Sequence, residues 1–152
     1  MSQKITVSVI GGHDANKEAK NLAMEIGEII AKADAVLVCG GLDGVMKYAA
    51  KGAKMAGGLT IGILPGKDKK DANPYIDIAL PTSMGYSRNA IVACSADIII
   101  ALPGSHGTRS EISYGLVFGR PVIDLGNWGI EGMVKVKGLS EVKKIIQEHT
   151  KN

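Results

Sequence analysis

Apolar residues along this chain fall into two kinds of segment: short runs, several of them continuous, and longer stretches with helical spacing. The short runs, which this pattern predicts to be strands, are 5–10, 35–39, 59–64, 97–102 and 122–125. After the first run, apolar residues recur at every third or fourth position from Ala19 to Ala33, which is the period of an amphipathic helix. The other helices that the pattern predicts are 44–56, 84–95, 108–118 and 140–149.

The alternation of these segments predicts the fold class. Strands that are apolar throughout are buried on both faces, and helices between them indicate a mostly parallel sheet covered on both sides. Segment 76–80 instead alternates polar and apolar residues, which predicts a half-exposed edge strand, and 66–74 is expected to be a loop. No linker or repeat interrupts the pattern, so we expect a single α/β domain over residues 1–152.

Four of the predicted strands end in glycine-containing turns. The turns are Gly11-Gly12, Gly40-Gly41, Pro65-Gly66 and Pro103-Gly104. In open parallel sheets, ligands bind beyond the carboxyl ends of the strands, so these turns are candidate binding loops. The alternative for any one of them is that glycine simply makes a short connection.

The richest of these turns is Pro103–Glu111, with the sequence PGSHGTRSE. It follows a buried run and leads into a predicted helix, so its glycines and the N–H groups of the helix N-terminus can bind an anion. A carboxylate, Glu111, lies in the first turn of the predicted helix. The alternative is a capping box, in which Thr108 caps the helix and Glu111 reaches back to it.

Arg88 is placed near the start of the predicted helix 84–95. A positive charge there opposes the helix dipole unless an anion is bound, so Arg88 is a candidate ligand-binding residue. The alternative is an ordinary surface arginine. His106, within the PGSHGTRSE turn, and His13 can each meet a ligand or only solvent.

Several function classes are excluded by the sequence. The chain has 152 residues and a net charge of +3, with lysines spread along it, which argues against general nucleic-acid binding. Neither a P-loop nor a GxGxxG dinucleotide motif is present, and no His, Cys or carboxylate spacing suggests a metal site. Cys39 and Cys94 lie far apart in apolar settings and are expected to be buried thiols in a reducing compartment. With no signal peptide or membrane-length apolar run, we expect a cytoplasmic protein.

At these motifs the chain resembles the LONELY GUY family, whose signature is PGGxGTxxE. The PGSHGTRSE segment matches with one departure, Ser105 in place of the second glycine. Arg88-Asn89 stands where that family has an Arg-Lys step, with Asn89 in place of lysine. The segment Gly40–Met46 also resembles the family's glycine-rich segment after the second strand.

The resemblance implies a Rossmann-like dimer that hydrolyses the N-glycosidic bond of nucleoside 5′-monophosphates and requires no cofactor. It implies that Arg88 and Glu111 are catalytic. A neighbouring branch, the molybdenum-cofactor carrier proteins, shares the fold and binds a pterin phosphate without known hydrolysis. The short chain, Ser105 and Asn89 favour that branch. The residues expected to bind phosphate or ligand are Gly11, Gly12, Gly40, Gly41, Gly44, Met84, Asn89, Pro103, Gly104, Ser105, His106, Gly107 and Thr108.

The sequence therefore predicts a protein that binds a small phosphate-bearing molecule and interacts with neither nucleic acid nor membrane. Hydrolysis of a nucleoside monophosphate is the first hypothesis, carriage of a pterin-type molybdenum cofactor the second, and a regulatory domain without ligand the third. A homodimer or a dimer of dimers is expected. The helices after Met84 and Gly107 carry surplus small and apolar residues for such an interface: Ala90, Ile91, Ala93, Ile112, Leu116 and Phe118.

Overall fold

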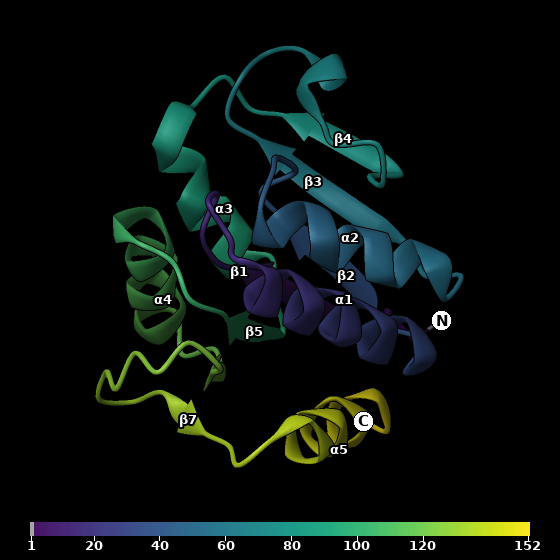
Figure 1. The fold of residues 1–152 in the computed structure, drawn as a ribbon, viewed down its shortest axis with the longest axis vertical. Coiled ribbons are helices and arrows are strands. Elements are labelled where there is room, and N and C mark those ends of the chain that lie inside the picture. Colours follow the sequence, from purple (N-terminus) through teal and green to yellow (C-terminus); the bar gives the residue numbers. More distant parts are fainter. Residues whose placement is uncertain (1) are drawn as a thin grey trace.

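The computed structural model describes residues 2–152, and their strands form one sheet in which every neighbouring pair is parallel (Figure 1). The sheet has seven strands in the order β4-β3-β2-β1-β5-β6-β7. The predicted α/β fold with a parallel sheet is confirmed. The strands are β1 (Thr6–Ile10), β2 (Val36–Cys39), β3 (Thr60–Leu64), β4 (Ile78–Pro81), β5 (Ile98–Ala101), β6 (Val122–Asp124) and β7 (Val134–Lys135).

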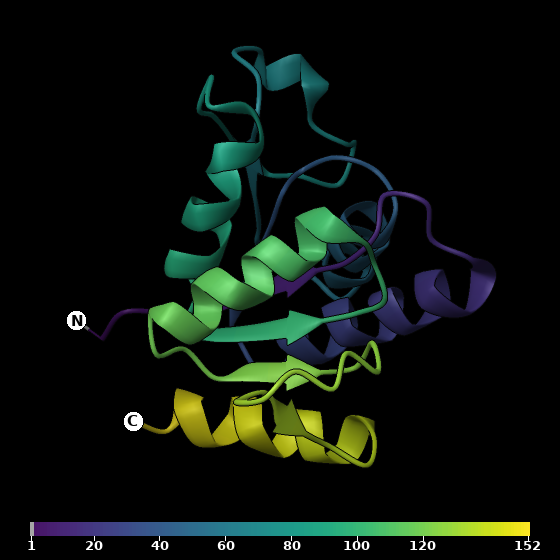
Figure 2. The same ribbon diagram turned by 90° about the vertical axis from the view of Figure 1, so that its left-hand side faces the viewer.

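Helices cover both faces of this sheet, as Figures 1 and 2 show from two directions. The α-helices are α1 (Lys17–Lys32), α2 (Val45–Met55), α3 (Asn89–Cys94), α4 (His106–Val117) and α5 (Leu139–Thr150), and the short 3-10 helices are η1 (Lys69–Asp71) and η2 (Gly85–Arg88). Alternate residues of β5 point to opposite faces: Ile98 and Ile100 pack with α1, α2 and α5, whereas Ile99 packs with α3 and α4. The core is thus two apolar layers separated by the sheet.

Most element bounds lie close to those that the apolar pattern predicts, and the differences have local causes. The predicted helix 84–95 is split into η2 and α3, and the predicted helix 108–118 begins two residues earlier, at His106. Strand β7 was not predicted because two residues carry no readable period. Cys39 is buried as expected, but the expectation for Cys94 was wrong, since that thiol is exposed at the end of α3.

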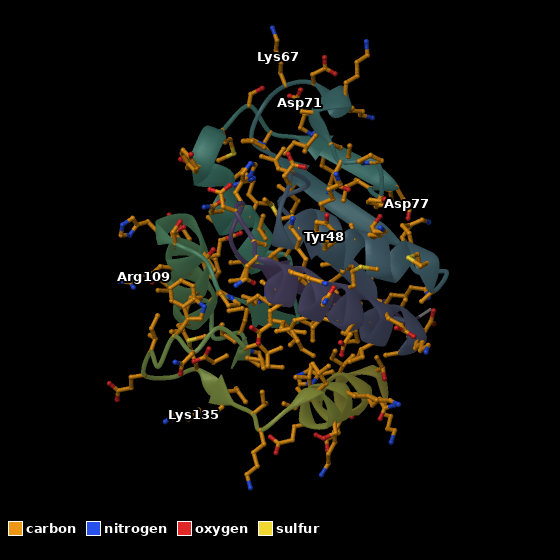
Figure 3. All side chains as sticks on the ribbon, viewed as in Figure 1. Tyr48, Lys67, Asp71, Asp77, Arg109 and Lys135 are labelled. Atoms are coloured by element: carbon orange, nitrogen blue, oxygen red, sulfur yellow. The ribbon has the colours of Figure 1, made fainter. Side chains whose placement is uncertain are left out.

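The mixed-charge loop between β3 and β4 lies at the periphery. Lys67 extends away from the body of the protein, as Figure 3 shows, and both Lys67 and Asp71 are exposed. The loop charges therefore play no part in the core.

None of the helices within residues 2–152 is long and apolar enough to cross a membrane.

Helices α1 and α2 approach each other closely through two glycines. A Cβ on Gly27 would lie 2.0 Å from the carbonyl oxygen of Ala49, and a Cβ on Gly52 would lie 2.0 Å from the carbonyl oxygen of Met24. Such distances are far inside van der Waals contact, so any side chain at these positions forces the helices apart. The spacing of α1 and α2 sets where the loops that precede each helix lie.

We expect Gly27→Ala to lower the free energy of unfolding by about 1–3 kcal/mol, because the added methyl group overpacks the contact between α1 and α2. Alanine is otherwise the better helix former by roughly 0.5–1 kcal/mol, so propensity alone predicts the opposite sign. Urea denaturation measures the change. Gly107→Ala in α4 is the control, since the nearest atom to its added Cβ, Asn89 Nδ2, is 3.8 Å away. A Gly27→Ala variant as stable as the wild type would contradict the close contact.

Candidate functional site

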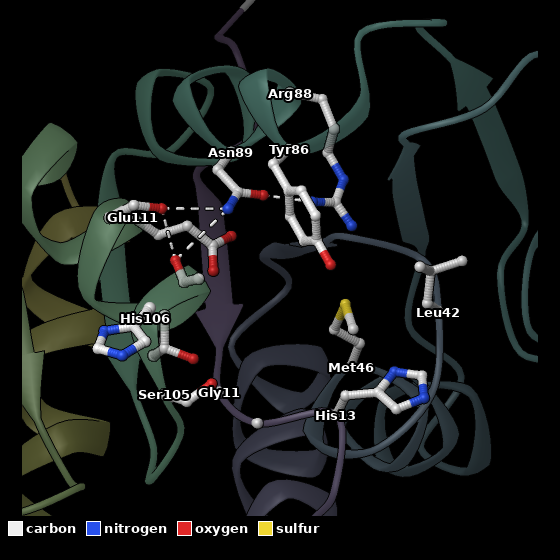
Figure 4. Close-up of a pocket in the computed structure, with 14 residues that line it drawn as sticks. Gly11, His13, Leu42, Met46, Tyr86, Arg88, Asn89, Ser105, His106 and Glu111 are labelled. Carbon is white, nitrogen blue, oxygen red and sulfur yellow. Dashed lines mark hydrogen bonds between the residues drawn. The ribbon is translucent and has the colours of Figure 1, made fainter.

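A cleft of about 780 Å³ opens at the carboxyl ends of the central strands (Figure 4). β1 and β5 are neighbours in the sheet, but β1 leads to α1 on one face and β5 leads to α4 on the other. The loops after these two strands diverge there and leave a crevice, which is the usual ligand position in such sheets. The cleft therefore lies where the strand order predicts a binding site.

The loops after β1 and β5 are held together by close backbone contact. The Gly12 N–H donates to the carbonyl oxygen of Pro103 at 2.8 Å. A Cβ on Gly104 would lie 2.1 Å from Thr108 Oγ1 and 2.8 Å from the Gly12 nitrogen, so only glycine fits there. A Cβ on Gly44, at φ +71°, would lie 2.2 Å from the carbonyl oxygen of Gly12 and 2.3 Å from that of His13. These glycines bring the backbone of both loops to the wall of the cleft.

The N-terminus of α4 faces this cleft without a cap. Ser105 is the N-cap residue, and its side chain makes no capping hydrogen bond. The N–H groups of His106, Gly107 and Thr108 have no acceptor within residues 2–152. Since all three residues line the cleft, their N–H groups and the helix dipole favour a bound anion. The capping-box alternative was wrong, because Thr108 and Glu111 lie inside α4 and not at its start.

Glu111 is the acidic residue of the cleft, and it is only 8% exposed. Within residues 2–152 its carboxyl group takes part in no hydrogen bond or ion pair. Burial raises the pKa of Glu111 to about 8, although the positive charge of Arg88 acts in the opposite direction. At neutral pH the group is therefore mostly protonated.

Arg88 is buried at the junction of η2 and α3, so its interpretation as a surface arginine was wrong. Its Nε donates to the carbonyl oxygen of Ile63 at 2.8 Å, and a terminal nitrogen donates to that of Gly40 at 3.5 Å. The other terminal nitrogen donates to Asn89 Oδ1. Burial lowers the pKa of Arg88, while the nearby Glu111 opposes this shift. The guanidinium is thus anchored to the ends of β2 and β3, and it also lines the cleft.

Asn89 continues this network to the helix on the other side of the cleft. Its Nδ2 donates to Ser110 Oγ at 3.1 Å and to the carbonyl oxygen of Gly107 at 3.4 Å. Ser110 Oγ in turn donates to the Gly107 carbonyl at 2.6 Å. Asn89 therefore joins Arg88 to the first turn of α4, which fixes the distance between the guanidinium and the uncapped N–H groups.

The structure brings many of the predicted site residues together, and others lie behind the cleft wall. The predicted residues that line the cleft are Gly11, Gly12, Arg88, Asn89, Ser105, His106, Gly107, Thr108 and Glu111. The predicted residues that do not line it are Gly40, Gly41, Gly44, Met84, Pro103 and Gly104. Several of these act indirectly. A Cβ on Gly40, for example, would lie 2.9 Å from the Arg88 guanidinium, so glycine leaves room for the arginine.

Four lining residues were not singled out in the sequence. They are Leu42, Met46, Tyr86 and Ser110. His13, for which the sequence left contact with a ligand or only with solvent open, also lines the cleft. Ser110 immediately precedes Glu111 and Tyr86 lies two residues before Arg88, so their place in the sequence was a usable signal. Leu42 and Met46 come from the turn after β2 and the start of α2, and their apolar side chains resemble core residues in the sequence. Within residues 2–152, no group of three His, Cys, Asp or Glu side chains is placed to hold a metal ion.

Known proteins with this fold include two molybdenum-cofactor proteins. The molybdenum cofactor binding protein of Rippkaea orientalis is 40% identical, with a TM-score of 0.78 over 81% of this chain and 77% of that one. The Moco carrier protein of Chlamydomonas reinhardtii is 32% identical, with a TM-score of 0.84 over 96% of this chain and 99% of that one.

A relative with a different described activity matches more distantly. It is the cytokinin riboside 5′-monophosphate phosphoribohydrolase of Mycobacterium tuberculosis, 30% identical over 121 residues, which are 74% of this chain and 65% of that protein. The resemblance to the LONELY GUY family and to its molybdenum-cofactor branch is confirmed by these matches. The chain belongs to the SLOG cluster4 family, since the model of that family matches residues 4–152.

Proposed function

We propose that this protein binds a phosphate ester of a pterin-type heterocycle in the cleft and carries it without cleaving it. The phosphate would lie at the uncapped start of α4, against the N–H groups of His106, Gly107 and Thr108. The molybdenum cofactor is a ligand of this chemistry, and here it is cargo. The relatives from R. orientalis and C. reinhardtii, described as binding or carrying that cofactor, support the same ligand class.

The observation that carries the proposal is the buried Glu111, whose carboxyl group has no hydrogen-bond or ion-pair partner within residues 2–152. With a pKa raised to about 8, about a tenth of these groups are ionised at pH 7. A neutral carboxyl group tolerates a phosphate nearby and can donate a hydrogen bond to a heterocycle, whereas a carboxylate would repel the anion. Asn89 adds no positive charge that would keep Glu111 ionised, unlike the lysine of the family's Arg-Lys step. The site therefore favours binding over cleavage.

Hydrolysis of a nucleoside 5′-monophosphate, the first hypothesis from the sequence, is the second candidate. It is favoured by Arg88 and Glu111, the implied catalytic pair, because both line one cleft. Breaking an N-glycosidic bond builds positive charge on the ribose, which an ionised carboxylate would stabilise. Such a mechanism needs the minor, deprotonated form of Glu111, so its rate would rise with pH up to about 8.

We expect the protein to bind neopterin monophosphate and to release no free base from AMP at pH 7. Titration with fluorescence detection measures the binding, and chromatography of an AMP incubation at pH 6, 7 and 9 measures the base. Base release that increases from pH 6 to 9 and is lost in Glu111→Gln would overturn the carrier proposal and select the hydrolase. If the protein binds neither phosphate ester, only the third hypothesis remains, a regulatory domain that has no ligand.

The proton on Glu111 can be tested through stability. The unfolded chain loses this proton near pH 4.5 and the folded chain near pH 8, so the free energy of unfolding falls as pH rises through this interval. Glu111→Gln removes this loss. The free energy of unfolding of the variant, relative to that of the wild type, should therefore increase by roughly 3–5 kcal/mol between pH 4 and pH 9, since one pKa unit is about 1.4 kcal/mol.

Urea denaturation of both proteins at several pH values measures this gain. Glu131→Gln, a change at an exposed glutamate, is the matched control and should show no such trend. If the difference between Glu111→Gln and wild type did not change with pH, Glu111 would be ionised in the folded protein, and the argument for a carrier would lose its basis.

We also propose that the protein is a homodimer that associates through the outer face of α4. Tyr114 and Phe118 stack with ring centroids 6.0 Å apart, and Val117 beside them is 78% exposed. An exposed apolar patch of this kind is typical of a protein interface. Two residues expected to face a partner do not: Ala93 and Ile112 are fully buried within the subunit.

Light scattering at micromolar concentration should therefore give a mass of at least twice 15.9 kDa. Val117→Asp should reduce it to the mass of one chain, because the interface would have to bury an unpaired charge. Met55→Asp is the control, since Met55 is 72% exposed on α2, away from α4. A wild-type protein with the mass of a single chain would contradict the proposed homodimer.

A further inference from the structure

Tyr86 is a large aromatic residue that lines the cleft and yet is 86% exposed. It projects from η2 over the cleft, in front of Arg88 (Figure 4). An exposed tyrosine ring on the wall of a cleft covers none of the protein's own core. Its free face is available to a ligand.

The backbone that carries Tyr86 is firmly held although its side chain is free. Segment 82–85 is tied to the end of β3 and the turn after it: the N–H groups of Thr82, Ser83 and Gly85 donate to the carbonyl oxygens of residues 64, 66 and 65, at 3.1, 2.9 and 2.9 Å. The Thr82 hydroxyl adds a bond of 2.7 Å to the Leu64 carbonyl. Arg88, two residues beyond Tyr86, is anchored by its own hydrogen bonds. The ring is therefore presented from a fixed position, which lowers the entropic cost of using it to bind.

On the side away from α4, the ring has two apolar side chains near it as well as the Arg88 guanidinium. Met46 lies below the ring and Leu42 beyond it, as Figure 4 shows. The opposite wall is polar, with Glu111 and the N-terminus of α4. A ligand with a phosphate at α4 would place its other end between the Tyr86 ring and the Met46 thioether. Aromatic faces and thioethers both favour contact with a flat π-system.

We propose that Tyr86 is a specificity-determining residue that stacks on the planar heterocycle of the ligand and selects fused-ring phosphate esters over simple sugar phosphates. This inference rests on the proposed binding of a heterocyclic phosphate ester. It adds that selection acts on the ring system through Tyr86, whereas the start of α4 binds only the phosphate.

The test compares two probes, neopterin monophosphate and ribose 5-phosphate, by calorimetric titration of the wild type, Tyr86→Ala and Tyr86→Phe. Tyr86→Ala should lower the affinity for neopterin monophosphate roughly 5- to 100-fold, which is the range for losing the stacking of one aromatic ring on another. The same variant should bind ribose 5-phosphate as the wild type does. Tyr86→Phe keeps the aromatic face, so it should restore the affinity for neopterin monophosphate to near the wild-type value.

The ratio of the affinities for the two probes is the deciding quantity. If Tyr86 had a purely structural role, its loss would lower the affinity for both probes equally. If Tyr86→Ala lost affinity for both probes equally, or lost no affinity for neopterin monophosphate, this inference would be overturned and the proposed function would still stand. A wild-type protein that binds neither probe would overturn the proposed function and this inference with it.

Discussion

The buried guanidinium of Arg88 is the interaction on which the arrangement of the site depends. A buried charge is costly unless hydrogen bonds replace the water that it loses, and Arg88 obtains them from the carbonyl groups of Ile63 and Gly40 and from Asn89. These partners belong to the ends of β3 and β2 and to α3. The same side chain thus fixes the backbone that presents Tyr86 and, through Asn89, the position of α4.

This network also determines the electrostatics of the cleft. Because Arg88 is satisfied by neutral acceptors, it forms no ion pair with Glu111 and only partly offsets the effect of burial on the Glu111 carboxyl group. The uncapped α4 N-terminus and the positive charge of Arg88 then both favour an anion in the cleft. A site with one anchored cation, an uncapped helix and a neutral acid is well suited to holding a phosphate ester. Cleavage would need the acid in its charged form, which this environment disfavours.

Much of the fold could be predicted from the sequence because it depends on local pattern. β2 and β5 are continuous apolar runs, which are typical of parallel strands buried on both faces. The edge position of β4 follows from its alternating exposure. The break between η2 and α3 could not be read in this way, since hydrogen bonds to the distant residues 64–66 hold the preceding segment out of the helix.

By itself, the sequence determined the parallel α/β class, the glycine turns after the strands, and Arg88, Asn89 and Glu111 as residues of interest. Only the tertiary structure decided where these residues lie and what they contact. It replaced the capping box with an uncapped helix start and buried Arg88. It also brought Leu42, Met46 and Tyr86 to one cleft from separate segments. The physical reason is that pKa, burial and stacking depend on neighbours from distant segments, whereas strand and helix patterns depend on adjacent residues.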